Sequence, residues 1–364
     1  MIRLIYFSRD YTSHDFRFLS ALVQSGHKVY YLTLERRGHI LEDRALPPDI
    51  EQITWSGGKQ PFSYTDLPRL YSDLKRLIKR FKPDLIQAGP LLTAAFLVTL
   101  TGFQPLLSMS WGYDLLQEAD RSVLSRWITR YTLRRSSGML GDCQTVRNKA
   151  IVYGMPNERI VTFPWGIDLA HFSPSDRRLA AEPFTLLSTR SWEPIYGVEI
   201  IARAFVEIAQ RYQHVNLVLL GNGSQAGMLR KIFLDGNVLE RVSFPGQVGY
   251  GALPRYYRSA NLYLSASHSD GTSISLLEAM ACGLPVLASD IPGNQEWIQP
   301  GVQGWLFRDC NVSSLVEGIT RAIHQSDHLP DLSRNARQLA EERADWHKNF
   351  PILLDAYKMI LERA

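Results

Sequence analysis

The chain has 364 residues, which is long for a single hydrophobic core and sufficient for two domains. Hydrophobic residues make up 45% and charged residues 21%, as in ordinary soluble globular proteins, and the net charge of +4 is too small to indicate a nucleic-acid partner. No apolar run has the length of a membrane span, and the N-terminus turns polar too early for a signal peptide. The three cysteines, Cys143, Cys282 and Cys310, show no disulfide framework and no metal-ligand spacing, so we expect a cytosolic protein.

Apolar, β-branched runs alternate with amphipathic helical patterns along most of the chain, which is typical of parallel sheets covered by helices. The first series of predicted strands occupies residues 3–7, 28–34, 84–88, 106–110, 138–141 and 160–163. The second series occupies residues 184–189, 216–220, 242–244, 262–265 and 286–288. Between the two series, Pro164 to Asp176 is rich in Pro, Gly and Asp, which indicates a break between domains. We therefore predict an α/β protein with two doubly wound parallel sheets.

Two segments of the first half combine helical apolar spacing with an excess of positive charge. Asp66 to Lys82 contains six basic and two acidic residues, and Arg121 to Arg135 contains five arginines. One interpretation is that both are ordinary helices packing their apolar faces on a sheet. The other is that they form a basic, aromatic surface that rests reversibly on anionic lipid.

The most informative segment is SHSDGTSISLLEAMACGLPVLASDI, which begins at Ser267. Asp270 precedes a predicted helix that runs to Cys282, and Glu278 lies about one turn inside that helix. Backbone N–H groups at a helix N-terminus bind phosphate oxygens, and a carboxylate one turn further in can accept both hydroxyls of a ribose. The segment therefore indicates a sugar-nucleotide site, with a simple capped helix and glycine stop as the plainer alternative. The residues expected at the helix mouth are Gly271, Thr272, Ser273, Ile274 and Ser275.

The order of acids and glycines in this segment, D-G-T-S-I-S-L-L-E-A-M-A-C-G-L-P-V, resembles the acid-x7-acid signature of the retaining GT-B glycosyltransferases of family 4. Asp270 stands where the family usually has Glu, and Glu278 matches. The resemblance implies two facing Rossmann-like domains with an interdomain cleft. Their expected ranges are 1–168 for the acceptor side, 169–344 for the nucleotide sugar, and 345–364 for a final helix that packs back on the first domain.

Other segments of the second half fit the same resemblance. Arg190 opens R-S-W-E-P-I-Y-G, which is similar to the family's phosphate loop G-R-L-x-x-x-K-G, but Tyr196 takes the place of the lysine. Gly221 and Asn222 belong to a strand-G-x-G turn of the family's kind. After the next strand, relatives contact the nucleobase near two positions that are Gln247 and Val248 here.

The first half departs from the family pattern after its first strand, where relatives commonly have a Gly-Gly loop. Position alone makes His14, Asp15 and Arg17 candidates for the acceptor side, with helix capping by Ser13 or Asp15 as the alternative. Asp114 follows another strand and is a candidate ligand for a sugar hydroxyl.

The resemblance implies a retaining, hexosyltransferase-like enzyme of the kind used in polysaccharide biosynthesis, with no metal and no cofactor. It would move a sugar from a nucleotide diphosphate sugar to a hydroxyl of a glycan, glycolipid or small molecule, with Arg190, Asp270 and Glu278 as the catalytic residues. A nucleotide-sugar epimerase of the same architecture and a non-catalytic sugar-nucleotide-binding scaffold are the alternatives. The expected location is the cytoplasm, with reversible contact to the inner face of the membrane.

Overall fold

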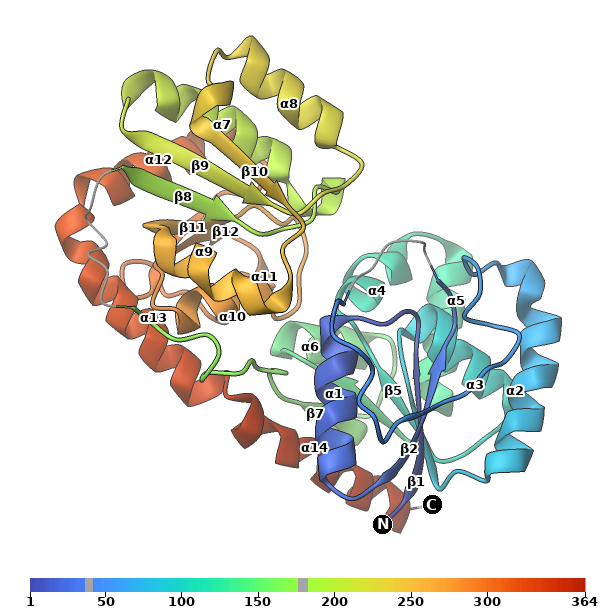
Figure 1. Cartoon of the computed structure of the whole chain (residues 1–364). Coiled ribbons are helices and arrows are strands. Elements are labelled where there is room, and N and C mark those ends of the chain that lie inside the picture. The colour runs from blue at the N-terminus through green and yellow to red at the C-terminus, as the bar shows by residue number, and fades with distance from the viewer. Residues whose placement is uncertain (37–41, 176–182, 364) are drawn as a thin grey trace. The chain divides into compact units, whose positions relative to one another are not determined.

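The computed structural model describes residues 1–36, 42–175 and 183–363, so Asp176, the end of the predicted break, lies outside the described residues. The chain divides into two compact units, Met1–Phe163 with Phe350–Ala364, and Pro164–Asn349. Each unit is a parallel sheet with helices on both faces (Figure 1). The predicted doubly wound α/β architecture is confirmed. The domain boundaries after residues 168 and 344 stay a prediction.

The first unit contains a seven-stranded sheet in the order β3-β2-β1-β4-β5-β6-β7, and every pair of neighbours is parallel. Its strands are β1 (Arg3–Ser8), β2 (Lys28–Thr33), β3 (Glu51–Gln52), β4 (Leu85–Ala88), β5 (Leu106–Met109), β6 (Gly138–Gly141) and β7 (Ile160–Thr162). The six strands predicted from the sequence are present. The edge strand β3 was not predicted, because two exposed polar residues carry no strand pattern.

The helices of the first unit pack apolar faces on both sides of its sheet. They are α1 (Ser13–Gln24), α2 (Leu67–Phe81), α3 (Phe96–Thr101), α4 (Tyr113–Leu116), α5 (Val123–Arg135), α6 (Gln144–Val152) and α14 (Trp346–Glu362), with short turns η1 (Tyr64–Asp66), η2 (Leu91–Ala95), η3 (Glu118–Asp120) and η4 (Asn157–Arg159). Helix α2 buries Leu70, Leu74 and Leu77, the spacing expected of one helix face. Helix α14 reaches this unit from the other one, and its Tyr357 hydroxyl donates to the side-chain oxygen of Gln87.

The second unit contains a six-stranded parallel sheet in the order β10-β9-β8-β11-β12-β13. Its strands are β8 (Phe184–Ser188), β9 (Val215–Leu220), β10 (Val242–Gly246), β11 (Leu262–Ser265), β12 (Val286–Ser289) and β13 (Gly304–Phe307). The five predicted strands are present, and β13 was missed because Gly304 and three following apolar residues are too short a run to stand out from a turn.

Two helical layers cover the second sheet. The helices are α7 (Val198–Arg211), α8 (Ala226–Asp235), α9 (Leu253–Ser259), α10 (Ile274–Ala281), α11 (Pro292–Gln295), α12 (Val312–His324) and α13 (Leu329–Arg343), with turns η5 (Pro194–Tyr196), η6 (Leu239–Arg241), η7 (Tyr250–Ala252) and η8 (Ser326–His328). Helices α7, α8 and α12 share one hydrophobic core with the sheet. Helices α9, α10 and α13 share the other.

Strand order reverses once in each sheet, between β1 and β4 in the first unit and between β8 and β11 in the second. In doubly wound sheets, ligands bind beyond the carboxyl ends of the strands at such a reversal, because the two loops diverge there and leave a crevice. Each unit is therefore expected to bind a ligand at its own reversal point.

Candidate active site

The reversal point of the second unit brings together two loops that carry predicted site residues. Strands β8 and β11 pair in parallel, so their carboxyl ends lie at the same edge of the sheet. The loop after β8 carries Arg190, and the loop after β11 carries Asp270. The Arg190 Nη2 atom donates a hydrogen bond to Asp270 Oδ2 at 2.7 Å, which makes an ion pair between the two loops.

Arg190 is the centre of this arrangement. Its Nη1 atom donates to Ser273 Oγ at 2.9 Å and to Ser275 Oγ at 3.1 Å. Its guanidinium carbon lies 4.2 Å from the ring centroid of Tyr196, so the aromatic ring that replaces the usual lysine stacks on the arginine. The Nε atom is buried and has no hydrogen-bond partner among the described residues. Burial lowers the pKa of Arg190, but Asp270 and the nearby tyrosines raise it by more, so the group stays charged.

The N-terminus of α10 faces the same arginine. Ser273 is the N-cap residue, but its hydroxyl caps no backbone N–H group of the helix and instead accepts from Arg190. The first backbone N–H groups of a helix have no partner within it, so they and the helix dipole favour an anion here. The helix ends as predicted: Cys282 is the C-cap residue, and Gly283 follows with φ of +67°.

Asp270 belongs to a tightly packed turn. Burial raises its pKa, and Arg190 counteracts that rise. A Cβ atom on Gly293 would lie 2.4 Å from the carbonyl oxygen of Gly271 and 2.5 Å from that of Asp270, so only glycine allows α11 to pack directly against this turn. The close packing fixes the backbone that places the carboxylate beside Arg190.

Glu278 lies inside a hydrogen-bond network one turn into α10. It is 8% exposed, and its Oε2 atom accepts from the Tyr257 hydroxyl at 2.8 Å. The Tyr257 hydroxyl lies 3.0 Å from Thr189 Oγ1, which lies 3.3 Å from the Tyr263 hydroxyl. Burial and Glu278 raise the pKa of Tyr257 well above its usual range, so this phenol remains a donor. The sequence did not reveal the two tyrosines, because they occupy ordinary core positions in α9 and β11.

The predicted G-x-G turn lies against the loop that carries Arg190. Gly221 has φ of +97°, and a Cβ atom there would lie 3.1 Å from the Arg190 carbonyl oxygen. The carbonyl oxygen of Asn222 accepts from the Trp192 N–H group at 3.0 Å. After β10, Gln247 is exposed, while the half-buried Val248 packs on the core shared by α9 and α10.

In the first unit, Asp15 caps a helix. Thr12 is the N-cap residue of α1, and Asp15 Oδ2 accepts from its backbone N–H group at 2.8 Å and from its hydroxyl at 2.6 Å. Burial raises the pKa of Asp15 to about 7. The capping alternative therefore describes Asp15, and the N-cap residue is Thr12 rather than Ser13.

Asp114 also binds its own surroundings. Its Oδ1 atom accepts from the Ser110 hydroxyl at 2.8 Å and the Trp111 N–H group at 2.9 Å, and its Oδ2 atom accepts from the Leu91 N–H group at 2.8 Å. The residue is 2% exposed, and burial raises the pKa of its carboxyl to about 6. These contacts hold the loop after β5 against the turn after β4.

His14 and Arg17 form a second small cluster in the first unit. The His14 Nδ1 atom lies 3.2 Å from Arg17 Nη2, and the ring stands edge-on to Trp111 with 5.2 Å between centroids. Burial and the arginine lower the pKa of His14 well below its usual range, so the ring is neutral. His14 and Arg17 therefore contact each other, and His14 also contacts Trp111.

Comparisons with known proteins cover nearly the whole chain. The model described as "Glycosyltransferase Family 4" matches residues 14–171, and "Glycosyl transferases group 1" matches residues 172–339. Over 241 residues the chain is 25% identical to a D-inositol 3-phosphate glycosyltransferase of Gordonia bronchialis, covering 62% of this chain and 52% of that protein. The chain thus spans about half the length of the curated relatives it matches.

Solved structures show the same fold at low identity. Sucrose-phosphate synthase from Thermosynechococcus elongatus has a TM-score of 0.82 at 18% identity, with 100% of both chains covered. HepE of Anabaena in complex with UDP and glucose has a TM-score of 0.79 at 19% identity, with 99% of both chains covered. Within the described ranges, every helix is too short or too polar to cross a membrane.

Proposed function

Because the chain belongs to family 4 of the glycosyltransferases, we propose that it transfers a sugar from a nucleoside diphosphate sugar to a hydroxyl acceptor. The single observation that carries this proposal is the position of Arg190 at the N-terminus of α10, with Asp270 and Ser273 holding it from a second loop. A buried cation beside the first N–H groups of a helix is an arrangement suited to a diphosphate.

The diphosphate would bind to Arg190 and to the backbone N–H groups at the N-terminus of α10. The buried Nε–H of Arg190, which has no partner in the described chain, is a donor available to a phosphate oxygen. As the glycosyl bond breaks, negative charge gathers on the leaving diphosphate, and a cation already in place stabilises that charge. Because Arg190 and the helix N-terminus supply this positive charge, we propose that transfer requires no metal ion.

Glu278 and Asp270 would bind the two sugars of the donor. Glu278 is anchored by Tyr257 through one oxygen, and its carboxylate would accept from the ribose hydroxyls. Asp270 would accept from hydroxyls of the transferred sugar. The HepE structure contains UDP and glucose, so UDP-glucose is the first donor to test.

We propose retention of anomeric configuration. Asp270 is paired with Arg190 and Glu278 with Tyr257, so neither acid is arranged as the covalent nucleophile that a retaining glycosidase uses. The acceptor oxygen would bond to the anomeric carbon on the face from which the diphosphate leaves. The bond from that carbon to the phosphate oxygen breaks, and the phosphate takes the proton of the acceptor hydroxyl.

A panel of nucleotide sugars tests the proposal. The purified protein should release nucleoside diphosphate from one of them when an acceptor is present, equally with and without a chelator. NMR of the product should show the donor's anomeric configuration. Interconversion of the sugar without release of nucleotide would establish an epimerase instead, and binding with neither reaction would establish a scaffold.

For the acceptor side, we propose contact with an anionic membrane through α5. This helix leaves Val123, Leu124 and Trp127 exposed by 79%, 59% and 53%, next to exposed arginines such as Arg126 and Arg130. Apolar side chains among cations suit insertion between anionic headgroups. The anionic lipid of the cytoplasmic leaflet is the corresponding surface, and a lipid-linked sugar acceptor would be reached there.

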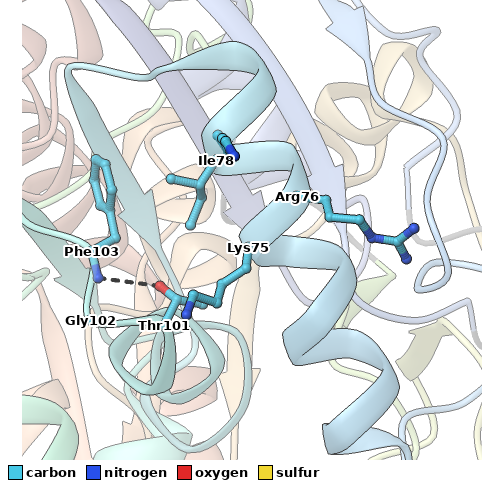
Figure 2. Close-up of a pocket in the computed structure, with 7 residues that line it drawn as sticks. Lys75, Arg76, Ile78, Thr101, Gly102 and Phe103 are labelled. Atoms are coloured by element: carbon cyan, nitrogen blue, oxygen red, sulfur yellow. Dashed lines mark hydrogen bonds between the residues drawn. The ribbon is translucent and has the colours of Figure 1, made fainter.

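Helix α2 would supply charge rather than insertion. Its apolar face is buried, whereas Lys75, Arg76 and Lys79 line a pocket of about 410 Å³ together with Phe103. In Figure 2, Lys75 runs beside the turn at Thr101 while Arg76 points away from it. Such a pocket has the size and charge for an anionic headgroup.

Vesicle cosedimentation tests the membrane proposal. Binding to anionic but not neutral vesicles is expected, and it should weaken with salt, because the attraction between charges is screened within about 10 Å at 0.1 M salt. The triple variant Val123/Leu124/Trp127→Ser should bind less at every salt concentration, and Arg76/Lys79/Arg80→Glu should lose binding most at low salt. The control Lys231→Glu changes an exposed lysine of the second unit. Equal, negligible binding to both kinds of vesicle would favour a soluble acceptor.

A further inference from the structure

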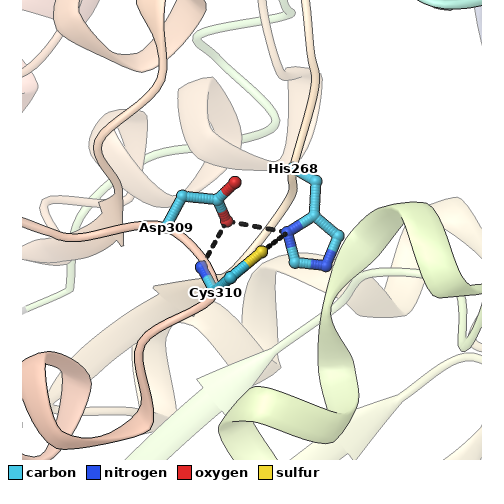
Figure 3. A group of neighbouring side chains, drawn as sticks. All are labelled: His268, Asp309 and Cys310. Atoms are coloured by element: carbon cyan, nitrogen blue, oxygen red, sulfur yellow. Dashed lines mark hydrogen bonds and ion pairs between the residues drawn. The ribbon is translucent and has the colours of Figure 1, made fainter.

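A histidine, a carboxylate and a thiol meet outside the donor site (Figure 3). His268 lies in the loop between β11 and α10, whereas Asp309 and Cys310 lie in the loop between β13 and α12. The His268 Nδ1 atom is 2.7 Å from Asp309 Oδ1 and 3.4 Å from Cys310 Sγ. The three potential ligand atoms all lie within 4.8 Å of one another.

We propose that these three side chains bind one divalent transition-metal cation of the Zn²⁺ type. A mixed set of imidazole nitrogen, carboxylate oxygen and thiolate sulfur suits Zn²⁺ and Co²⁺, and does not suit Mg²⁺ or Ca²⁺. With bonds of about 2.0–2.3 Å, tetrahedral ligands lie about 3.3–3.6 Å apart. The observed separations of 2.7 and 3.4 Å therefore need only small side-chain movements to admit the ion. Cys310 is exposed, so water can complete the coordination.

The same geometry excludes a nucleophilic triad. In a Cys–His–Asp site, the carboxylate and the nucleophile bond to opposite nitrogens of the ring. Here Asp309 and Cys310 both face Nδ1. Three groups converging on one point are arranged for a shared cation, not for proton transfer across an imidazole.

Glu199 provides a second, independent observation. Its Oε1 atom lies 4.0 Å from the other ring nitrogen of His268, Nε2, and its Oε2 atom is buried without a hydrogen-bond partner among the described residues. A metal on Nδ1 requires the proton on Nε2, and a carboxylate facing that N–H group is the usual support of a metal-binding histidine.

The charges around the thiol favour a cation. The carboxylates of Asp309 and Glu199 face the two nitrogens of the His268 ring beside this thiol, so negative charge gathers around it. Cys310 also has φ of 56°, a conformation that side-chain-bearing residues rarely adopt, and it places the Sγ atom beside His268. The backbone N–H group of His268 donates a hydrogen bond to the backbone carbonyl oxygen of Ile195 at 2.9 Å. Because Ile195 precedes Tyr196, an ion bound to His268 would also stabilise the loop that carries Tyr196.

Titration of the whole 364-residue chain with Co²⁺ in reducing buffer tests this site. One equivalent should bind with the absorption band of thiolate-to-cobalt charge transfer, and Zn²⁺ should displace it. His268→Ala and Cys310→Ser should each weaken binding at least tenfold and Cys310→Ser should abolish the band, while Glu199→Gln should weaken binding about tenfold. Cys143→Ser and His324→Ala, which change a cysteine and a histidine elsewhere, should leave both readouts unchanged.

Three outcomes would overturn the assignment: no saturable binding in the wild type, binding without the thiolate band, or unchanged affinity in the His268 and Cys310 variants. Circular dichroism of each variant verifies that it is folded. The readout does not depend on sugar transfer, so this site and the proposed function can fail separately.

Discussion

The two reversal points differ in what their polar side chains bind. Between β8 and β11, Arg190 and Asp270 come from different loops and hold each other beside a helix N-terminus. In the first unit, Asp15 follows β1 and Asp114 follows β5, the strand next to β4. Both accept hydrogen bonds from hydroxyl and backbone N–H groups and pair with no cation among the described contacts. A carboxylate after a parallel strand is therefore weak evidence for a ligand site. A charged pair between loops, with a donor still available, is stronger evidence.

The sharpest test of this difference is Arg190→Ala. Turnover should fall about 100- to 1000-fold, because the variant loses the cation that we propose stabilises the leaving diphosphate. Nucleotide affinity should fall much less, because the charge on the diphosphate grows mainly as the bond breaks. Steady-state kinetics and calorimetry separate the two quantities. Wild-type turnover in this variant would show that the arginine serves packing alone.

The opposite behaviour is expected of Asp114→Ala. Its removal leaves one hydroxyl and two backbone N–H groups without their acceptor, so the free energy of unfolding should fall by about 2–3 kcal/mol. UDP affinity should stay the same. Urea unfolding followed by tryptophan fluorescence measures the loss, with Asp66→Ala, at an exposed ion pair with Arg69, as control. Unchanged stability with lost activity would make Asp114 a substrate ligand.

Glu278→Gln should weaken UDP binding about tenfold, or about 1.4 kcal/mol. The amide remains able to accept from Tyr257, but the charged acceptor that we propose for the ribose hydroxyls becomes a neutral one. Isothermal titration calorimetry measures the change, and Glu341→Gln, at a surface ion pair, is the matched control. Equal affinities would refute the ribose role.

The pH dependence of stability should identify Asp15 as a buried cap. Its folded pKa is about 7, above the ordinary value of about 4, so the folded chain retains a proton that the unfolded chain releases. The stability contributed by the neutral carboxyl is complete below about pH 4 and is lost as the pH rises through about 7. Between pH 5 and 8 the wild type should lose about 3 kcal/mol relative to Asp15→Asn. If the free energy of unfolding changed with pH in the same way in the two proteins, the raised pKa of Asp15 would be contradicted.

Substitutions of Tyr196 are expected to change UDP affinity least. Tyr196→Phe retains the stacking on Arg190 and should leave UDP affinity unchanged. Tyr196→Lys adds a cation but removes a contact worth about 0.5–1 kcal/mol, so affinity should change less than about fivefold. A large gain in UDP affinity in Tyr196→Lys would mean that the phosphate site of the wild type lacks positive charge.

The sequence predicted the helices and strands that depend on local pattern. It did not predict contacts between side chains from loops that are distant in the sequence. The start of α10 and its glycine stop follow from neighbouring residues, and so do the predicted strands. The contacts of Glu278 with Tyr257, and of His268 with Cys310 across 42 positions, depend on the order of strands in the sheet. Asp15 was ambiguous because an acid near a helix start can either cap the helix or face a ligand.

Helix α14 makes the second unit an insertion in the first. The chain leaves the first unit after Phe163 and rejoins it at Phe350, where Tyr357 bonds to Gln87 and Ile360 packs against Gly138. Residues 164–349 can therefore be excised as one continuous piece, whereas the first unit can be made alone only by joining two pieces with a new linker. Fluorescent labels at the two chain ends would both report on the first unit. A label pair meant to detect hinge motion must place one dye between residues 164 and 349.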